Sequence, residues 1–526
     1  MKRAIDGILA KRIDSYSIEN GMPSLVLMER AAMKTAEYTA ELMGTGGTAC
    51  ALLVCSMGNN GADGLAAARM LAMDGKECHV LLIGNSEHAT PEFNVQLRLV
   101  KHLDIPVYFF DEDIHGKFFD EYTVIVDALF GIGLSRDIEG AYRRMVELIN
   151  TSGKKVVSVD IPSGINSANG QVMGAAVHAD ITVTFGYAKL GELLYPGKSF
   201  TGELHVENIG FLPFDFAEYV KTQGTGVSAL YFENSTDFGK YILKRPARSN
   251  KGNYGKPLII AGSKDMTGAA FMSGLAAYRT GAGVVTVLTH ESADAYLKSM
   301  LPEAIVKSYG EEPEAVLESA LKAASVVVIG PGMSVNELSK RVTAYVLSHA
   351  EVPVIADADA LNIISENTDE WLAGKWTGGR AFPLVITPHV GEMSRLTGDS
   401  IKEIAADIRH YALEFAKRYG VYCVLKDAVS VVASPDGEVF LTTCGNPGMA
   451  TAGAGDVLTG ILAAVNAWVQ DSFFDRIAVG VQLHAMAGDA AAGRLGEHSV
   501  MARDIIDSIP ELLKRPGVDM NWRHNL

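Results

Sequence analysis

Residues 445–456 read GNPGMATAGAGD, and an apolar series with the spacing of a buried helix face follows them: Val457, Leu458, Ile461, Leu462 and Val465. The segment therefore predicts a glycine-lined turn that opens a buried helix. Gly453 and Gly455 let the backbone approach an anion closely, and the N-terminus of the new helix directs positive potential at it. This combination favours a nucleotide-using enzyme.

Asp456, the last residue of this turn, allows two interpretations. A carboxylate at the start of a helix commonly caps or stabilises that helix. A carboxylate beside a bound phosphate can instead act as a general base. The spacing alone leaves both interpretations open.

Short β-rich runs alternate with helical patterns along the whole chain. Several runs are continuously apolar, as expected for parallel strands covered on both faces. Asp63–Asp74 has the periodicity of an intervening helix, so the pattern indicates doubly wound α/β sheets. The predicted strands are Ala51–Cys55, His79–Ile83, Thr123–Asp127, Lys155–Asp160, Ile181–Phe185, Pro257–Ala261, Val284–Leu288, Ser325–Ile329, Val354–Asp357, Leu384–Thr387 and Val421–Leu425.

The alternation weakens between about residues 213 and 238, where Pro, Gly, Thr and Ser are mixed. We therefore predict two α/β domains, over residues 1–215 and 238–515, joined by a linker over residues 216–237. A single sheet through all 526 residues is the alternative, but it would outgrow the usual single core.

Charge and cysteine content narrow the class of protein. A formal net charge of -16 repels phosphate backbones, so we expect no nucleic-acid partner. No apolar run is long enough to suggest a membrane span, and the first residues do not resemble a signal peptide. The five cysteines contain no CxxC pair. They predict a cytoplasmic, reduced protein with no zinc site and no disulfide framework.

Three turns in the first half follow apolar strands. Gly58–Gly64 reads GNNGADG, and its Asn and Asp oxygens suit a hard cation or sugar hydroxyls. The alternative is that the asparagines only occupy left-handed turn positions. Asp127 and Asp160 each end a predicted strand, at the edge where open α/β sheets bind ligands, although each could instead cap a turn.

The second half of the chain contains four further turns with candidate ligand-binding residues. His389 lies in TPHVGE (387–392), and it is either a ligand contact or a structural histidine. Lys426 opens KDAVS (426–430), which is either a nucleotide segment or a polar turn with a solvated lysine. Gly330–Met333 and Gly262–Ala270 also follow strands, where tight turns suit a ligand crevice, and the latter has the alternative of a capped helix start.

The longer string GNPGMATAGAGDVLTG closely resembles the ADP- or ATP-dependent NAD(P)H-hydrate dehydratases of the ribokinase superfamily, and the resemblance covers about residues 250–513. Ala452 departs from the family's GG-x-GD form. The resemblance implies a ribokinase-like α/β/α fold with Asp456 as catalytic base. It implies dehydratase substrate contacts from Ala270, Gly332, His389 and Asp456, and nucleotide contacts from Lys426, Asp427, Ala428, Val429, Ser430 and Gly455.

The strings GNNGADGL, VDALFGIGL and VDIPSG, with VLMERAA near the start, together resemble the YjeF N-terminal domain, the NAD(P)H-hydrate epimerase, over about residues 1–212. Met57 and Ala62 depart from the family's GPGNNGGDG. The resemblance implies a Rossmann-like doubly wound sheet, Asp160 as acid/base group, and a potassium site from Asn60, Asp127 and Ser163. It implies epimerase substrate contacts from Asn59, Asn60, Gly61, Ala62, Asp63, Gly131, Ile132, Gly133, Leu134, Ser135, Arg136, Asp137, Tyr142 and Asp160.

Together the two resemblances imply a bifunctional enzyme that repairs NADH hydrate and NADPH hydrate. One domain would interconvert the R and S epimers, and the other would dehydrate the S epimer with ADP, ATP being the alternative, and with Mg²⁺ on the phosphates. A homo-oligomer is expected, of a size that the sequence leaves open. The alternative hypotheses are that the protein is an ATP-dependent kinase of a small alcohol, or that it is a non-catalytic binding scaffold.

Overall fold

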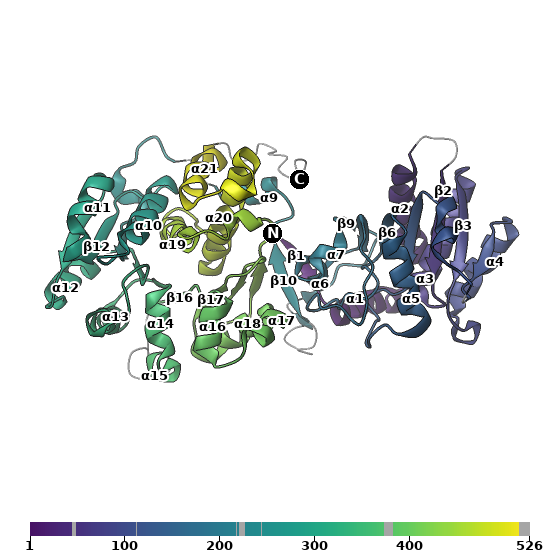
Figure 1. Ribbon diagram of the computed structural model, residues 1–526, viewed down its shortest axis with the longest axis horizontal. Coiled ribbons are helices and arrows are strands. Elements are labelled where there is room, and N and C mark those ends of the chain that lie inside the picture. Colours follow the sequence, from purple (N-terminus) through teal and green to yellow (C-terminus); the bar gives the residue numbers. More distant parts are fainter. Residues whose placement is uncertain are drawn as a thin grey trace. The chain divides into compact units, whose positions relative to one another are not determined.

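The computed structural model describes residues 1–44, 49–111, 113–216, 218–219, 227–242, 245–372 and 382–514. The chain forms two compact units (Figure 1). The N-terminal unit spans Arg3–Ala229, and the C-terminal unit comprises Leu230–Leu526 with Met1–Lys2. Each unit contains helices packed on a largely parallel sheet, so the predicted fold class, two α/β domains, is confirmed.

The N-terminal unit is built on a seven-stranded parallel sheet of order β4-β3-β2-β5-β6-β7-β9. From β2 the chain winds outward through β3 and β4, then returns to β5 and winds the other way. The carboxyl ends of β2 and β5 therefore flank the topological switch point, where such sheets bind ligands. These strands are β2 (Cys50–Cys55), β3 (Glu77–Leu82), β4 (Val107–Phe109), β5 (Val124–Ala128), β6 (Lys155–Val159), β7 (Ile181–Phe185) and β9 (Glu203–Glu207).

Helices cover both faces of this sheet. One apolar cluster joins the sheet to α2, α3 and α4, and another joins its opposite face to α5. A short parallel pair, β1 with β8, lies outside the main sheet. The remaining elements of the unit are β1 (Lys2–Ile5), α1 (Gly7–Glu19), α2 (Ser24–Met43), α3 (Asn59–Met73), η1 (Ser86–His88), α4 (Pro91–His102), η2 (Gly116–Glu121), α5 (Gly140–Thr151), β8 (Ala188–Lys189), α6 (Leu190–Leu193) and α7 (Lys198–Thr201).

The C-terminal unit has a sheet of order β13-β12-β11-β14-β15-β16-β17-β18-β19-β10. Its strands are parallel from β13 to β17, after which β17, β18 and β19 form an antiparallel meander. The bounds are β10 (Ser228–Tyr231), β11 (Pro257–Ile260), β12 (Thr286–His290), β13 (Ile305–Tyr309), β14 (Val326–Ile329), β15 (Val354–Ala356), β16 (Leu384–Ile386), β17 (Tyr422–Leu425), β18 (Val431–Ala433) and β19 (Val439–Leu441).

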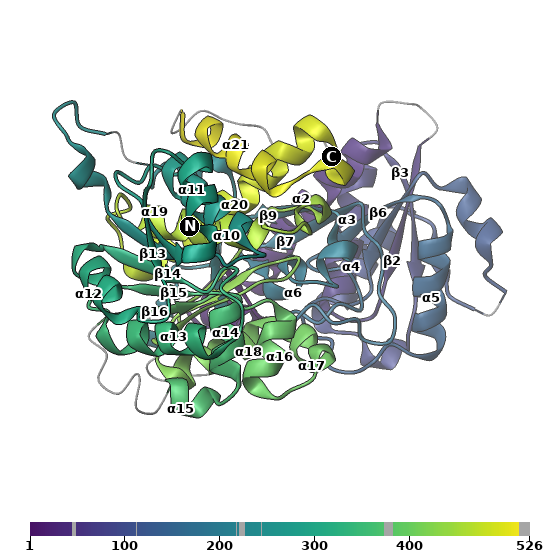
Figure 2. The ribbon, with the colours of Figure 1, turned by 60° about the vertical axis from the view of Figure 1, so that its left-hand side comes forward.

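Figure 2 shows helices above and below this sheet, with α10, α11, α20 and α21 on one side and α13, α14, α16 and α18 on the other. Helix α19 is buried between the sheet and α10, α20 and α21. The helices are α9 (Ser235–Gly239), η3 (Lys251–Tyr254), α10 (Thr267–Arg279), η4 (Glu291–Ala293), α11 (Asp294–Met300), α12 (Glu314–Ala323), α13 (Glu337–His349), α14 (Asp359–Ser365), α15 (Thr368–Leu372), α16 (Val390–Thr397), α17 (Ile401–Ala406), α18 (Ile408–Tyr419), η5 (Pro447–Met449), α19 (Ala454–Val465), α20 (Phe473–Leu495), η6 (Glu497–Ser499) and α21 (Ala502–Lys514).

All of the predicted strands are present, with ends shifted by at most two residues. The sequence missed strands that are short, exposed or antiparallel: β1, β4, β8, β9, β10, β13, β18 and β19. Strand β10 and the start of α9 lie within the predicted linker, and residues 217 and 220–226 of that stretch are outside the described residues. Within the described part of the chain, every helix is too short or too polar to cross a bilayer.

Candidate active sites

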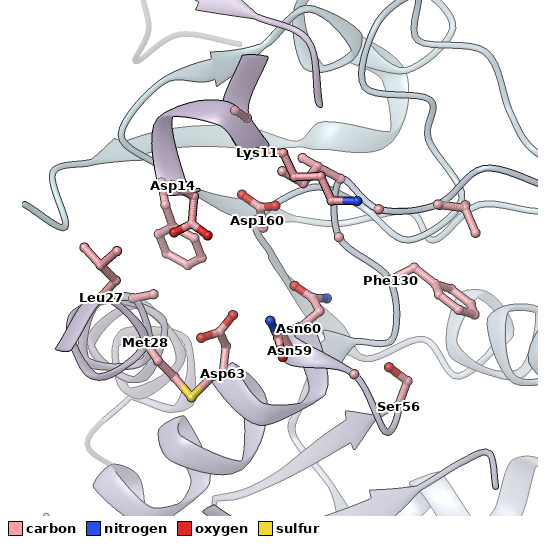
Figure 3. Close-up of a pocket in the computed structure, with 18 of the residues that line it drawn as sticks. Lys11, Asp14, Leu27, Met28, Ser56, Asn59, Asn60, Asp63, Phe130 and Asp160 are labelled. Atoms are coloured by element: carbon pink, nitrogen blue, oxygen red, sulfur yellow. The ribbon is translucent and has the colours of Figure 1, made fainter. Parts of the chain in front are cut away.

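A cavity of about 670 Å³ opens at the carboxyl ends of β2 and β5 in the N-terminal unit. Figure 3 shows Asn59 and Asn60 at the start of α3 on one side of it, with Asp160 across the opening. Helix α1 and helix α2 complete the wall. The predicted epimerase residues that line it are Asn59, Asn60, Asp63, Gly131, Ile132, Gly133, Leu134, Ser135, Arg136, Tyr142 and Asp160. Gly61, Ala62 and Asp137 are not among its lining residues.

The turn into α3 depends on a glycine. Gly58 is the residue before the helix, and no side chain caps the helix there. Free amides at a helix N-terminus attract anions.

Gly61 lies so close to the end of β2 that a Cβ atom would fall 1.8 Å from the carbonyl oxygen of Ser56. Gly61 and the neighbouring buried Ala62 therefore hold the start of α3 against the strand.

We predict that Gly61→Ala destabilises the N-terminal unit by about 3 kcal/mol, because the backbone of Ser56 cannot move aside as a flexible side chain would. Chemical denaturation of the full chain measures the change. Gly116→Ala is the matched control, since a Cβ atom at Gly116 would meet nothing within 4 Å. Equal stability of the two variants would show that the close approach of α3 to β2 is not required.

Asp160 is held by a buried lysine. It follows β6 with a left-handed backbone (φ 67°), which is rare for a non-glycine residue, and its amide donates to the carbonyl of Val183 at 2.8 Å. Lys189, only 2% exposed, pairs with the Asp160 carboxylate and donates to Thr184 Oγ1 at 2.7 Å. Burial raises the pKa of the adjacent Glu192 to about 8, although Lys189 opposes that shift.

Two further carboxyl groups face the same cavity as Asp160. Figure 3 shows Asp14 of α1 and Asp63 of α3 pointing into the space that Asp160 enters. Burial raises the pKa of both Asp14 and Asp63, and the negative charge of Asp160 adds to each shift. Protonated carboxyl groups can donate hydrogen bonds. The cavity thus combines one lysine-paired carboxylate with two that readily take up a proton.

Asp127, near the carboxyl end of β5, is fully buried. Its Oδ1 accepts from Ser163 Oγ at 2.6 Å and from the Leu129 amide, and its Oδ2 accepts from Ser158 Oγ and from the Ser163 amide, each at 2.9 Å. These four hydrogen bonds fix the position of the carboxylate. The potassium site from Asn60, Asp127 and Ser163 stays a prediction. Of these residues, Asn60 has a side-chain nitrogen, Nδ2, that is buried and makes no hydrogen bond in the structure.

The candidate site of the C-terminal unit is centred on Lys426, which follows β17. Its Nζ donates to Asp357 Oδ1 at 2.8 Å, and Thr387 Oγ1 donates to the same oxygen at 2.7 Å. Burial lowers the pKa of Lys426, but the neighbouring carboxylates, Asp357 and then Glu392, outweigh it and the net pKa is raised. Lys426 is therefore not the solvated lysine of a polar turn.

Asp456 lies in the first turn of α19, facing this lysine. Helix α19 has Gly453 before it in a left-handed conformation (φ 91°), and the structure has no side-chain cap there. Asp456 is therefore not the capping residue, but its carboxylate lies in the first turn, where it also stabilises the helix N-terminus, so both interpretations stay open. Burial, followed by repulsion from Asp357, raises the pKa of Asp456 to about 7, against the opposing effect of Lys426. A carboxyl group with that pKa is suited to accept a proton near neutral pH.

His389 has a structural role at the start of α16. Its Nδ1 accepts from the amides of Gly391 and Glu392, at 3.0 and 3.2 Å, and its own amide donates to Glu392 Oε2 at 2.9 Å. Its ring is about half exposed, with Nε2 3.5 Å from Glu392 Oε1. The structural reading of His389 is supported, and a substrate contact through Nε2 stays a prediction.

Of the other residues predicted to contact nucleotide or substrate in this unit, some are exposed and others are buried. Asp427 and Ala428 are exposed, Ser430 is half-buried, and Val429 is buried between β17 and β18. Ala270 is fully buried on α10. Gly332 is left-handed (φ 61°) and packs on Met266, where a Cβ atom would fall 2.8 Å from that residue's carbonyl oxygen.

Other carboxyl groups lie near enough to Asp456 to affect its charge. Asp357 and Asp359 both act on its pKa, and Glu392 adjoins Lys426. Carboxylate oxygens together with nucleotide phosphates are the usual ligands of Mg²⁺. Because one or two carboxylates suffice for Mg²⁺ when nucleotide phosphates supply the other ligands, the side chains present are chemically compatible with a magnesium ion that binds together with a nucleotide.

Comparisons with known proteins match both units. The family model YjeF-related protein N-terminus matches residues 24–191, and the model NAD(P)H-hydrate dehydratase matches residues 257–511. The bifunctional NAD(P)H-hydrate repair enzyme of Thermofilum pendens is 37% identical over 517 residues, covering 96% of this chain and 95% of that protein. The chain belongs to the family of bifunctional NAD(P)H-hydrate repair enzymes.

The chain is also similar to a second bifunctional repair enzyme and to a solved structure. The Escherichia coli enzyme of the same description is 33% identical over 473 residues, covering 89% of this chain and 86% of its own. A solved structure, the ADP/ATP-dependent NAD(P)H-hydrate dehydratase of Bacillus subtilis co-crystallised with ATP/Mg²⁺, is 31% identical, with a TM-score of 0.47, covering 54% of this chain and 98% of that one.

Sequence reasoning missed several residues of this repair enzyme's candidate sites. Lys11 and Asp14 of α1 and Lys189 of β8 line the N-terminal cavity, and Asp357 pairs with Lys426 in the other unit. Asp357 could have been found from the sequence, because it ends a predicted strand as Asp127 and Asp160 do. No local sequence pattern marks the other three residues, since no glycine-rich turn surrounds Lys11, Asp14 or Lys189.

Proposed function

We propose that the protein restores hydrated NADH and NADPH in two steps, one at each site. The cavity of the N-terminal unit interconverts the R and S epimers. The site around Asp456 dehydrates the S epimer and converts ADP to AMP and phosphate. The observation that carries this proposal is the presence, in one member of the repair-enzyme family, of two separate sites that each hold a carboxyl group suited to proton transfer.

At the N-terminal site, the charges orient the substrate. The diphosphate of the dinucleotide lies toward the free amides at the start of α3, with Lys11 and Arg136 on the cavity wall supplying positive charge. The damaged ring then reaches Asp160. Inversion at the hydroxyl-bearing carbon requires its bond to the ring nitrogen to open, as the hydroxyl loses a proton and the nitrogen gains one, and then to close on the other face with the reverse transfers. Asp160, positioned by Lys189, transfers these protons, and Asp14 and Asp63 donate hydrogen bonds when protonated.

At the C-terminal site, the terminal phosphoryl group of ADP passes to the substrate hydroxyl and makes it a good leaving group. Asp456 accepts the hydroxyl proton as that oxygen attacks phosphorus. The amides of Gly453 to Gly455, at the N-terminus of α19, stabilise charge on the transferring group, and Lys426 adds a cation beside them. Bound Mg²⁺ would neutralise the phosphates.

The pH dependence of dehydration follows from Asp456. A general base acts only when ionised, and burial raises the pKa of this group to about 7. We predict that kcat/KM for dehydration is constant above that pH and falls about tenfold per pH unit below it. Initial rates across a pH series measure this. A rate unchanged down to about pH 5 would contradict the role of Asp456 as base.

The nucleotide is tested with the purified S epimer of hydrated NADH. Separate incubations contain ADP, ATP or neither, and recovery of the reduced-nicotinamide absorbance is followed. The proposal predicts rapid recovery with ADP and none without nucleotide. No recovery with either nucleotide would remove the dehydratase proposal, and recovery with ATP alone would replace ADP as the nucleotide. Phosphorylation of a small alcohol without cofactor recovery would favour the kinase reading.

A further inference from the structure

At the edge of the N-terminal sheet opposite the cavity, three side chains of different chemistry converge. They are Cys50, which begins β2, and Glu77 and His79 at the start of β3. Each contributes one atom, a thiol sulfur, a carboxylate oxygen or a ring nitrogen, and the three atoms lie within 4.8 Å of one another. In the described part of the chain this is the one group of three such side chains so close together.

The register of the parallel pair produces this convergence. Cys50 and Glu77 are paired across β2 and β3, and His79 is two residues farther along β3. Successive side chains alternate between the faces of a strand, so all three residues lie on the same face, the one that packs on α5. Cys78, between Glu77 and His79, lies on the other face, where its sulfur contacts Ala68.

The ring of His79 is already oriented. Its Nδ1 lies 3.0 Å from the hydroxyl of Tyr122, which is buried after η2, and Tyr108 of β4 contacts the ring by its edge. Metal-binding histidines commonly place one ring nitrogen against such a partner while the other binds the ion. Nε2 is thus the nitrogen left for an ion. Cys50 is only 6% exposed, while Glu77 is exposed and leaves the site open to solvent.

We propose that Cys50, Glu77 and His79 bind a zinc-class divalent cation, with water as a fourth ligand. Thiolate and imidazole ligands select zinc over magnesium or calcium, which prefer oxygen alone. Ligands about 2.0–2.3 Å from a tetrahedral zinc lie within about 4 Å of one another, so only small side-chain adjustments are needed. The bound ion joins the amino ends of β2 and β3 and stabilises the N-terminal unit.

This site shares no residue with either candidate active site and does not depend on the proposed function. The sequence predicted no zinc site because a search for closely spaced cysteines cannot find ligands on neighbouring strands. Because zinc binds the thiolate form of cysteine, binding releases the Cys50 proton and weakens as the pH falls.

The test uses the full chain freed of metal. Co²⁺ is added as a spectroscopic substitute for zinc, and near-ultraviolet absorption reports sulfur-to-cobalt charge transfer. Competition with a chromogenic chelator then gives the affinity and number of zinc ions bound. We expect the band in the wild-type protein and in the control Cys78→Ser, and its loss in Cys50→Ser and in His79→Gln. Tyr122→Phe should weaken zinc binding by roughly tenfold.

Thermal unfolding without metal checks that each variant is folded. His79→Gln, which changes a half-buried side chain, keeps the test valid if Cys50→Ser fails to fold. Addition of Zn²⁺ should raise the unfolding temperature of the wild-type protein and of Cys78→Ser, but not that of Cys50→Ser or His79→Gln. Absence of the charge-transfer band from the wild-type protein, or its persistence in Cys50→Ser or His79→Gln, overturns the proposal.

Discussion

Replacement of Asp456 by Asn should lower the rate of dehydration by roughly 10²- to 10⁴-fold, the usual contribution of a positioned general base. The substitution preserves size and removes only the ability to accept the hydroxyl proton. It should leave epimerisation unchanged, because the proposed epimerase residues all belong to the other unit. The measurement is absorbance recovery from the S epimer with ADP, alongside a separate assay of R-to-S conversion.

Asp436→Asn is the matched control for this experiment. Asp436 is exposed in the turn between β18 and β19, so its variant loses the same charge without touching the site. It should dehydrate the S epimer at the wild-type rate. A dehydration rate in Asp456→Asn within a few fold of wild type would return Asp456 to the role of a helix-start carboxylate. Loss of both activities would mean that the assignment of one reaction to each unit is wrong.

Replacement of Asp160 by Asn should produce the opposite pattern, a loss of epimerisation of roughly 10²- to 10⁴-fold with dehydration of the S epimer intact. Asp160 has a left-handed backbone, a conformation that Asn adopts at least as readily as Asp. The side-chain amide oxygen can still accept from Lys189. The variant therefore removes the ionisable group and keeps the turn that follows β6.

Conversion of the pure R epimer by the full chain, in the presence of ADP, measures this effect. Asp120→Asn, at an exposed position in η2, is the control for the loss of one carboxylate from the same unit. If Asp160→Asn consumes the R epimer as fast as this control, Asp160 is not the acid/base group. Asp14, Asp63 and Glu92 are the other carboxyl groups that line the cavity, and they would then be tested.

The sequence predicted the central strands well because they are buried on both faces. A continuous apolar run such as ALLVC has few alternatives to a parallel strand between helices. β10 was missed because its four residues follow a stretch of Gly, Thr and Ser, and its pairing with β19 comes from more than two hundred residues away. Such pairing depends on the folded sheet and leaves no local periodicity.

The same contrast holds for the candidate sites: residues within a local motif could be predicted, and contacts between distant segments could not. Asp160 and Asp456 were found because each stands beside a strand end or a glycine-rich turn. Lys189 reaches Asp160 from a different strand, and its neighbours in AKLGEL give no sign of that contact. The hydrogen bonds of Asp127 and the capping role of His389 likewise emerge only from geometry. Pairings between distant segments are what sequence patterns could not supply.

The central claim is that one chain carries two complementary activities. A mixture of R and S hydrates of NADH, incubated with ADP and the intact protein, tests it most directly. The account predicts that the whole mixture returns to NADH, whereas the Asp160→Asn chain stalls once the S fraction is consumed. Equal, incomplete recovery by both proteins, or no recovery by either, would contradict it.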